Sequence, residues 1–411
     1  MKKLLERVCG LDVHRDTVKA CARIPKEGKP DEREELIKTF GTTTPDLLLL
    51  RDWMKALGVT DAAMESTGVY WKPIYHILED DFRVILVNAA HIKNVPGRKT
   101  DVIDCAWIAH LLECGLLSAS FIPPKPIRDL RDLTRYRKEL TQERTREVQR
   151  LHGVLQNAGI KLSSVASDIM GVSGQRMIKA LMEGTTDPEV LADLAKGRLR
   201  AKLPGLRKAL TGRFRDHHAF LTSEILAHID YIEETLERLS KRIEEAIRPF
   251  SAQKEVLKTI PGWNDKTAEA TISEIGVDMS KFPADGNLSS WAGLCPGNNE
   301  SAGKHKSGKR RKGNKWLCAA LTESANAVIR DKDSYYAALY ARVVRRRGHK
   351  RAVIAVAHSM LVAAYHMLRT NKPYHELGGD YFDNLNREAI ERICVKRLER
   401  LGYRVTLQSV A

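Results

Sequence analysis

The stretch VCGLDV, residues 8 to 13, is the part of the sequence on which the fold depends most. Its apolar residues predict a buried central strand, yet Asp12 places a carboxylate in the middle of that strand. Burying a charge costs several kcal/mol unless a ligand or a metal ion compensates it. Asp12 is therefore the first candidate for a functional residue.

Further strands and helices follow from this stretch. Strands are expected at TVKACARI after the polar break at 14–16, at ELIKTF after the turn-rich KEGKPD, at 62–64 and at FRVILVN (82–88), and helices at 45–57 and 99–112. A strand meander that continues into alternating helix and strand predicts an α/β domain over residues 1–122.

Three further carboxylates join Asp12 as candidates. Glu65 ends a short strand in AAMESTGVYW, and strand ends of α/β sheets open onto clefts. Asp101 and Asp104 lie three residues apart on a predicted helix and so point the same way. Four converging carboxylates would bind Mg²⁺ or Mn²⁺, as phosphoryl-transfer enzymes require. Taken singly, Asp101 could be a helix-start acid and Glu65 a salt-bridge partner.

Composition points to a polyanionic partner. The 411 residues suffice for two or three domains, and 68 Lys+Arg against 52 Asp+Glu leave a net charge of +16. This excess favours nucleic acid first and an acidic membrane surface second. The apolar stretch 352–368 contains histidines and a serine and is short for a membrane span, so we expect a buried helix and no membrane. Seven scattered cysteines without a CxxC pair favour a reduced, cytoplasmic protein without structural zinc.

Long helices and a basic run characterise residues 123–254. A helix is predicted over 127–158, and isoleucines and leucines from Ile225 to Ile243 recur in steps of four and three, the coiled-coil rhythm, before Pro249 ends the helix. Antiparallel pairing within one chain and pairing across a dimer are both open. Residues 196–215 carry eight cations and no acid, which predicts phosphate-backbone binding or, alternatively, a solubilising surface. The candidates there are Arg198, Arg200, Lys202, Arg207 and Lys208.

A mostly helical domain is expected over residues 255–375, with an extension at 376–411 that gives no signal. LKTIPGWNDKTAEATISEIG (257–276) looks like a helix-hairpin-helix, with its hairpin at Ile260-Pro261-Gly262 and its second helix at 267–275. Such hairpins expose backbone N–H groups to phosphate oxygens, which makes Gly262 a candidate nucleic-acid contact. A plain pair of helices is the alternative.

Two more basic runs lie in this domain. Seven cations with interleaved glycines occupy 304–315, where a backbone and its charges could approach a polyanion closely; they are Lys304, Lys306, Lys309, Arg310, Arg311, Lys312 and Lys315. The second run, which includes Arg345, Arg346 and Arg347, follows Tyr335, Tyr336 and Tyr340. Cations beside rings suit backbone tracking and base stacking, while core tyrosines on a helix are the alternative.

Several motifs together resemble a known family. GLDVHRDTV, MESTGVYW and GRKTDVIDCAWIA resemble the acidic motifs of the DEDD transposases of bacterial insertion sequences, and Asp12, Glu65, Asp101 and Asp104 fill all four acidic positions. The resemblance implies a RuvC-like, ribonuclease-H-like N-terminal domain. SAGK (301–304) and GNKWL (313–317) resemble the surroundings of the family's serine. Ser301 is therefore the expected nucleophile, with Ser307 as the competing choice.

The resemblance also implies a reaction and its partners. It implies a recombinase guided by a noncoding bridge RNA that pairs with donor and target DNA, a serine joined to a DNA 5′-phosphate with Mg²⁺ assisting, and strand exchange through a Holliday junction. A homodimer or homotetramer with a composite site, acting at the nucleoid in the cytoplasm, is expected. This sequence departs from the family pattern in two places. The segment 160–220 is longer than the corresponding segment of compact family members. Cys318 stands where the family has a basic residue.

Two other functions stay open at this point. One is a metal-dependent junction resolvase or nuclease that uses water, with Ser301 as a bystander. The other is a non-catalytic RNA or DNA architectural protein in which the acids are remnants, although the completeness of the quartet counts against it.

Overall fold

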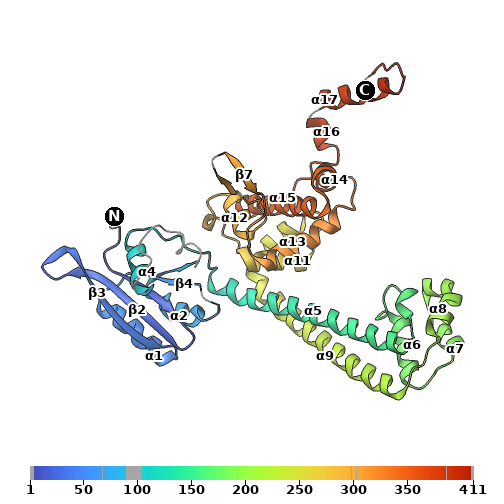
Figure 1. Ribbon diagram of the computed structural model, residues 1–411, viewed down its shortest axis with the longest axis horizontal. Coiled ribbons are helices and arrows are strands. Elements are labelled where there is room, and N and C mark those ends of the chain that lie inside the picture. The colour runs from blue at the N-terminus through green and yellow to red at the C-terminus, as the bar shows by residue number, and fades with distance from the viewer. Residues whose placement is uncertain are drawn as a thin grey trace. The chain divides into compact units, whose positions relative to one another are not determined.

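A computed structural model describes residues 4–66, 68–88, 104–297, 299–301, 303–385 and 387–408. The chain divides into two compact units, Met1–Ile122 and Pro123–Ala411. Figure 1 shows a sheet with helices in the first unit and mainly helices in the second. Each unit is described by itself.

The N-terminal unit is built on a mixed five-stranded sheet with the strand order β3-β2-β1-β4-β5. The strands are β1 (Val8–Val13), β2 (Thr17–Lys26), β3 (Lys29–Gly41), β4 (Asp61–Glu65) and β5 (Arg83–Val87). The first three run antiparallel, whereas β1, β4 and β5 run parallel. This confirms the predicted strand meander followed by alternating helix and strand, and the sheet is compatible with a ribonuclease-H-like fold.

Strand β3 is longer than the sequence predicted. We expected a turn over KEGKPD and a strand from 35, but β3 starts at Lys29. The hairpin turn needs only Glu27 and Gly28, because Gly28 adopts a φ of +74°, which glycine does without steric cost. Pro30 is tolerated because β3 is an edge strand.

Helices cover both faces of this sheet. Their bounds are α1 (Thr44–Ala56), α2 (Trp71–Leu78) and α4 (Asp104–Glu113). Side chains alternate along a strand, so Cys9, Leu11 and Val13 of β1 enter the core formed with α1 and α2. Val8 enters a second core that contains the buried side of α4. The two faces of β1 therefore serve two different cores.

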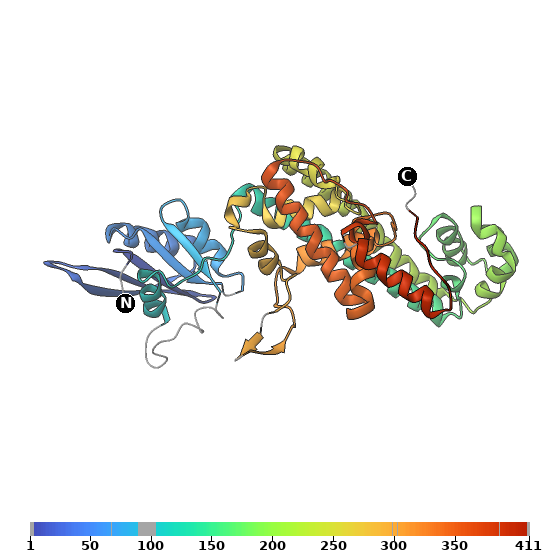
Figure 2. The same ribbon diagram turned by 90° about the horizontal axis from the view of Figure 1, so that it is seen from above.

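In the second unit, two long helices of one chain lie side by side and run antiparallel (Figures 1 and 2). They are α5 (Lys125–Asn157) and α9 (Asp216–Ile247). Both helices bury apolar residues, among them Leu151 of α5 and Ile229 of α9. The structure thus has the pairing within one chain. Helix α9 ends two residues before Pro249, as predicted, because proline lacks the N–H that continues a helix.

Residues 160–215 form a small helical cap module at the far ends of α5 and α9 (Figure 1). It contains α6 (Val172–Met182), α7 (Pro188–Asp193), the 3-10 helix η2 (Gly197–Lys202) and α8 (Leu203–Leu210). Its core includes Leu162, Ile178 and Leu206 together with Leu155 of α5. The sequence had suggested only a basic connecting stretch here, because such short helices carry little periodic signal.

The rest of the second unit is helical apart from one β-hairpin. Its elements are α10 (Ser251–Lys258), α11 (Asp265–Ile275), α12 (Asp285–Ala292), β6 (Asn299–Ser301), β7 (Lys304–Ser307), α13 (Lys315–Val328), α14 (Tyr335–Arg347), α15 (His349–Thr370), α16 (Tyr381–Leu385) and α17 (Arg387–Arg400). Within the described residues, α15 is the one helix whose length and hydropathy would permit a membrane span, but half of its apolar window is buried. It packs against α13 and α14 as a core helix.

Candidate active site

Asp12 and Glu65 lie at the same edge and on the same face of the sheet. Strands β1 and β4 are parallel neighbours, with Leu11 opposite Met64, and the two acids are the next residues of each strand. Val8 and Ala63, which lie an even number of residues before the acids, both enter the core under α4. Because side chains alternate, both carboxylates share the face that α4 covers.

Helix α4 brings Asp104 to this edge. The helix runs back along β1, because the amides of Leu4 and Leu5 at the start of the chain donate to the carbonyl of Glu113 at its last residue. Its first residue, Asp104, therefore lies near the end of β1 that carries Asp12. Gly10 permits this close packing, since a Cβ there would overlap the Cys105 carbonyl oxygen and the Ala109 nitrogen.

Three of the four predicted acids thus gather at one sheet edge, and Asp101 lies outside the described residues. The Asp12 side chain is 22% exposed, and its Oδ2 lies 3.2 Å from His14 Nε2. A hydrogen bond with Cys21 lowers the pKa of the Cys105 thiol, and the nearby Asp12 charge opposes this shift. Cys105 is the residue that follows Asp104. Lys19 is the cross-strand neighbour of Asp12 on β2.

The donor chemistry of this edge fits a hard cation. Carboxylate oxygens are the ligands that Mg²⁺ and Mn²⁺ prefer, and the three acids supply only such oxygens. Among the described residues, no three histidine, cysteine or acidic side chains are close enough to hold one metal ion. Metal binding therefore stays a prediction that involves Asp101 as well.

Ser301 lies at the turn of a β-hairpin and not in an irregular loop. In the pairing of β6 with β7, Ser301 stands opposite Lys304, while Ser307 stands opposite Asn299 at the other end of the hairpin. Gly303 has a φ of +73° in the turn. The structure describes the backbone, but not the side chain, of Ser301. Figure 2 shows the hairpin extending away from the helices of its own unit.

Glycines close the root of this hairpin. A Cβ at Gly293 would lie 2.7 Å from the Gly313 nitrogen, and a Cβ at Gly297 would overlap the Lys309 carbonyl oxygen. The two chain segments that lead to and from the hairpin therefore touch backbone to backbone. Contact this close is open only to residues without side chains.

A buried ion network stands beside this root. Glu274 of α11 is 1% exposed and accepts from Arg135 Nε at 2.7 Å and Nη2 at 2.8 Å. Arg131, whose pKa burial lowers to about 10, donates to the Glu274 carbonyl at 2.6 Å. Asn314 Nδ2 donates to Glu274 Oε2 at 2.6 Å. One guanidinium group of α5 and one amide before α13 therefore meet at the Glu274 carboxylate, while a second guanidinium group of α5 holds the main chain of the same residue.

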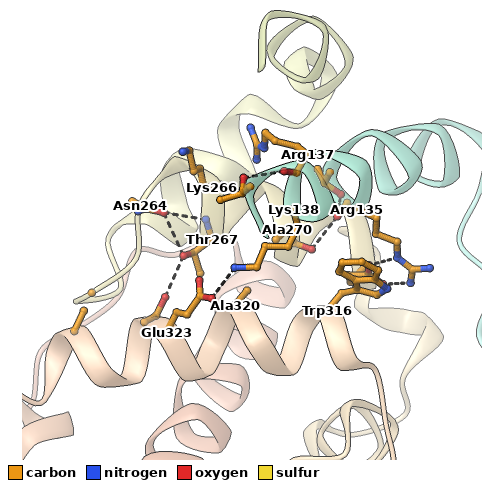
Figure 3. A pocket seen from close by; sticks show the side chains of 17 residues that line it. Arg135, Arg137, Lys138, Asn264, Lys266, Thr267, Ala270, Trp316, Ala320 and Glu323 are labelled. Carbon is orange, nitrogen blue, oxygen red and sulfur yellow. Dashed lines mark hydrogen bonds and ion pairs between the residues drawn. The ribbon is translucent and has the colours of Figure 1, made fainter. Parts of the chain in front are cut away.

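A pocket of about 370 Å³ lies between α5, α11 and α13 (Figure 3). Three of its basic side chains pair with acids: Arg135 with Glu274, Arg137 with Glu269 and Lys138 with Glu323, whereas Lys266 is exposed. The Trp316 ring lies 5.6 Å from the Arg135 guanidinium. Most of the charge in this pocket is therefore used within the protein.

The predicted hairpin at 260–262 joins α10 to α11. Helix α11 starts at Asp265, two residues earlier than predicted, because the Asn264 side chain caps it by accepting from the Thr267 amide. Gly262 has a φ of +81° and is exposed, and a Cβ added there would lie 2.9 Å from the Ser324 carbonyl oxygen of α13. Phosphate binding at this turn stays a prediction.

The predicted basic residues are mostly exposed. Arg198, Arg200, Lys202 and Lys208 are exposed on the cap module. Arg207, however, pairs with Glu189 of α7 at 2.7 Å, so this run is not uncompensated in space: the acid comes from another helix.

In the C-terminal runs, the exposed cations are Lys304, Lys309, Arg310, Arg311, Lys312, Lys315, Arg345, Arg346 and Arg347, whereas the Lys306 side chain lies outside the described residues. Base stacking by Tyr336 was wrong. Its ring is 1% exposed and stacks on Tyr374, and Tyr335 stacks on Phe382. Tyr336 is therefore a core tyrosine, the alternative considered for this helix, whereas Tyr335 is half-buried.

Comparison with known proteins matches both candidate regions to models of transposase families. A DEDD family model of IS110, described as a transposase, matches residues 9–160, and a model described as transposase IS116/IS110/IS902 family matches residues 254–341. The chain is 26% identical over 302 residues to the transposase for insertion sequence element IS1111A of Coxiella burnetii, which covers 70% of this chain and 72% of that protein. The two model matches include the acidic quartet and Ser301.

Proposed function

Because this chain belongs to the IS110 family of insertion-sequence transposases and is a DNA transposase, we propose that it cuts DNA with Ser301 and a metal ion bound by the acidic quartet. The observation that carries the metal part is the gathering of Asp12, Glu65 and Asp104 at one sheet edge. With Asp101 they would hold Mg²⁺ or Mn²⁺. When bound, the ion would neutralise charge on the phosphodiester.

Ser301 supplies the nucleophile in this proposal. Its oxygen forms a bond to the DNA phosphorus as the bond to the 3′-oxygen breaks, which leaves a 5′-phosphoserine and a free 3′-hydroxyl that takes up a proton. A serine is weak unless it loses its proton and the attacked phosphate is stabilised. The position of Ser301 at a hairpin turn beside Lys304 supports this role. The quartet and Ser301 belong to different units of the chain, so we propose that protomers of a dimer or tetramer combine them.

The exposed cations are proposed to bind two nucleic acids. Phosphate contacts of this kind are salt-dependent and sequence-independent, so sequence choice is assigned to a structured bridge RNA that pairs with donor and target DNA. We propose that the cap module and the β6–β7 hairpin contact RNA and DNA backbones. In the same proposal α5 and α9 form a coiled coil, α10 and α11 form a phosphate-binding helix-hairpin-helix, and strands are exchanged through a Holliday junction.

Adduct formation tests the proposed chemistry. Purified protein with its RNA, Mg²⁺ and target DNA should give a covalent protein–DNA adduct that migrates as one species under denaturing conditions. Ser301→Ala should abolish the adduct, whereas Ser307→Ala, a matched control in the same hairpin, should retain it. Asp12→Asn should slow adduct formation by about a hundredfold or more, and omission of Mg²⁺ should do the same.

The outcomes separate the competing functions. Cleavage at the wild-type rate by the Ser301→Ala protein would indicate a nuclease that uses water. Full activity of Asp12→Asn would remove the metal site from the mechanism. RNA binding without any cleavage by the wild-type protein would favour an architectural role. Equal adduct yield with a scrambled RNA would contradict guidance by base pairing.

A further inference from the structure

We propose that Glu274 is a positioning residue for the Ser301 hairpin, acting through Asn314 to fix the root of the hairpin against α5. This inference rests on the proposed role of Ser301, since it concerns how that residue is held in place.

Asn314 is the link between the network and the hairpin. It follows Gly313, whose α-carbon packs on the backbone at Ala292 and Gly293. Its Oδ1 accepts from the Trp316 and Leu317 amides at 3.0 Å each and so caps α13. Its Nδ2 donates to Glu274 at 2.6 Å. One side chain therefore fixes the point where the chain leaves the hairpin and enters α13.

Glu274 in turn is held by α5. Arg135 grips its carboxylate with two hydrogen bonds, a geometry that fixes orientation as well as distance. Arg131 donates to the main-chain carbonyls of Ser273 at 3.0 Å and Glu274 at 2.6 Å. The carboxylate cannot move without breaking these bonds in a buried site, where an unpaired charge is costly. The root of the hairpin is thereby held in a fixed position relative to α5.

Among the side chains of the hairpin segment that the structure describes, Arg310 donates to the Gly293 carbonyl at 3.4 Å and to Cys318 Sγ at 2.9 Å, and the other described positions from Gly303 to Lys312 are exposed. A Cβ added at Gly303 or Gly308 would have no neighbouring heavy atom within 4 Å. Residues 308–312, which lead back to the root, are all exposed. An extended hairpin of this kind takes its direction from its root. A nucleophile displaced by about 1 Å can lose a hundredfold in rate. The placement of Ser301 should therefore depend on the Glu274–Asn314 hydrogen bond.

The first test breaks that bond while it keeps the cap on α13. In Asn314→Asp, the carboxylate still accepts from the two amides, because aspartate is a good N-cap, but it faces Glu274 with like charge. We expect tryptic cleavage between Lys304 and Lys312 of the protein without nucleic acid to accelerate about tenfold. Adduct formation at saturating DNA should slow about tenfold or more, with DNA affinity changed less than twofold.

A swapped pair tests the interaction itself. In the double variant Glu274→Gln/Asn314→Asp, the glutamine amide donates to the aspartate, so the hydrogen bond returns in the opposite direction. The glutamine oxygen still accepts from Arg135 Nε, whereas the bond from Arg135 Nη2 is lost. It should restore most of the resistance to trypsin and much of the adduct rate that Asn314→Asp loses. A general loss of structure would not be rescued in this way.

Glu269→Gln is the matched control. Glu269 lies on the same helix, is also buried, and also joins α11 to α5 through Arg137 at 2.7 Å, but it has no bond to Asn314. Glu274→Gln and Glu269→Gln should lower the melting temperature to a similar extent. Faster tryptic cleavage and a slower adduct step should appear in Glu274→Gln alone.

The results decide the inference separately from the proposed chemistry. Unchanged tryptic cleavage in both Glu274→Gln and Asn314→Asp would overturn it, as would faster cleavage with an unaltered saturated adduct rate. If Ser301→Ala still forms the adduct, the proposed nucleophile is wrong, yet the cleavage pattern still shows whether Glu274 holds the hairpin. Rescue by the swapped pair supports the inference.

Discussion

The two candidate regions of this protein are built in different ways. At the edge of the N-terminal sheet, Asp12, Glu65 and Asp104 are placed by regular elements: two parallel strands and one helix packed on them. In the C-terminal unit, Ser301 stands on a hairpin outside the helical core, and its root is held by glycine contacts and by Glu274.

This difference shows where each region is vulnerable. Strand alternation and helix packing make the acidic edge depend on core packing, so damage to the core should remove the site and the fold together. The hairpin depends on a few polar contacts, so its activity should be separable from the stability of the protein. The predictions below test that contrast.

The largest effect is expected from Gly10→Ala. The new Cβ would overlap the backbone of α4, which cannot shift cheaply, so unfolding should become easier by about 3 kcal/mol or more and cleavage should be lost. Chemical denaturation followed by circular dichroism measures this. Gly153→Ala in α5 is the control. A Cβ added there would have no neighbouring heavy atom within 4 Å, so this variant should stabilise the protein slightly. Wild-type stability of Gly10→Ala would contradict the packing of α4 on β1.

Glu113→Gln should come next. This carboxylate is fully buried and accepts from Arg23 Nε at 3.1 Å and Arg33 Nε at 2.5 Å, which ties the end of α4 to β2 and β3. Loss of its charge should cost about 2 kcal/mol and reduce activity only in proportion to unfolding. The same change at exposed Glu27 should leave the urea midpoint unaltered. A larger loss of activity than of stability would argue for a direct role of Glu113.

Gly313→Ala should separate activity from stability on the other side of the comparison. Its Cβ would overlap the backbone at Ala292 and Gly293 and spread the hairpin root. We expect adduct formation to slow at least tenfold, with about 1 kcal/mol lost in stability. Gly286→Ala in α12, which meets no atom within 4 Å, serves as the control. Equal fractional losses of activity and of folded protein would show that the hairpin is not separable.

The smallest effect concerns the first turn of α9, next to the cap module. Burial, with the neighbouring Arg215 charge, lowers the pKa of His218 below its ordinary value of 6.5. The folded state therefore binds the proton less well than the unfolded state. The contribution of neutral His218 to the free energy of unfolding is fully present above pH 6.5. It declines as the pH falls through that value toward the lower pKa of the folded state.

The folded structure favours the neutral His218 ring because one ring nitrogen accepts from the Arg215 amide while the other donates to the Asn157 side chain. His218→Gln should flatten the decline in the urea midpoint between pH 7.5 and 5.5. His217→Gln, at the exposed neighbouring position, should keep it. A steeper decline in His218→Gln would contradict this account.

Much of the N-terminal region could be predicted from sequence. A charge inside an apolar strand marked Asp12, and the end of a short strand marked Glu65, because both signals are local. The length of β3 was missed because Pro30 and the residues around it carry turn-like composition, which an edge strand tolerates. Asp101 lies where the structure gives no description, so its place in the quartet stays a prediction.

The C-terminal region was harder to predict because its determinants are distant in sequence. Arg135 and Glu274 are 139 residues apart, and nothing local in either helix marks the other as its partner. Tyr336 carried a pattern compatible with base stacking, and only its contact with Tyr374 assigns it to the core. Arg207 likewise finds its acid on another helix.

By itself, the sequence determined the strands and helices of the N-terminal unit, the two long helices, the four acidic motifs and the basic segments, since periodicity, charge and motif spacing are properties of neighbouring residues. The tertiary structure decided which acids share a face, which cations are already paired and what holds the Ser301 hairpin. Those outcomes depend on long-range packing, where a missing side chain at Gly10 or Gly313 and a buried carboxylate at Glu274 determine how closely backbones approach.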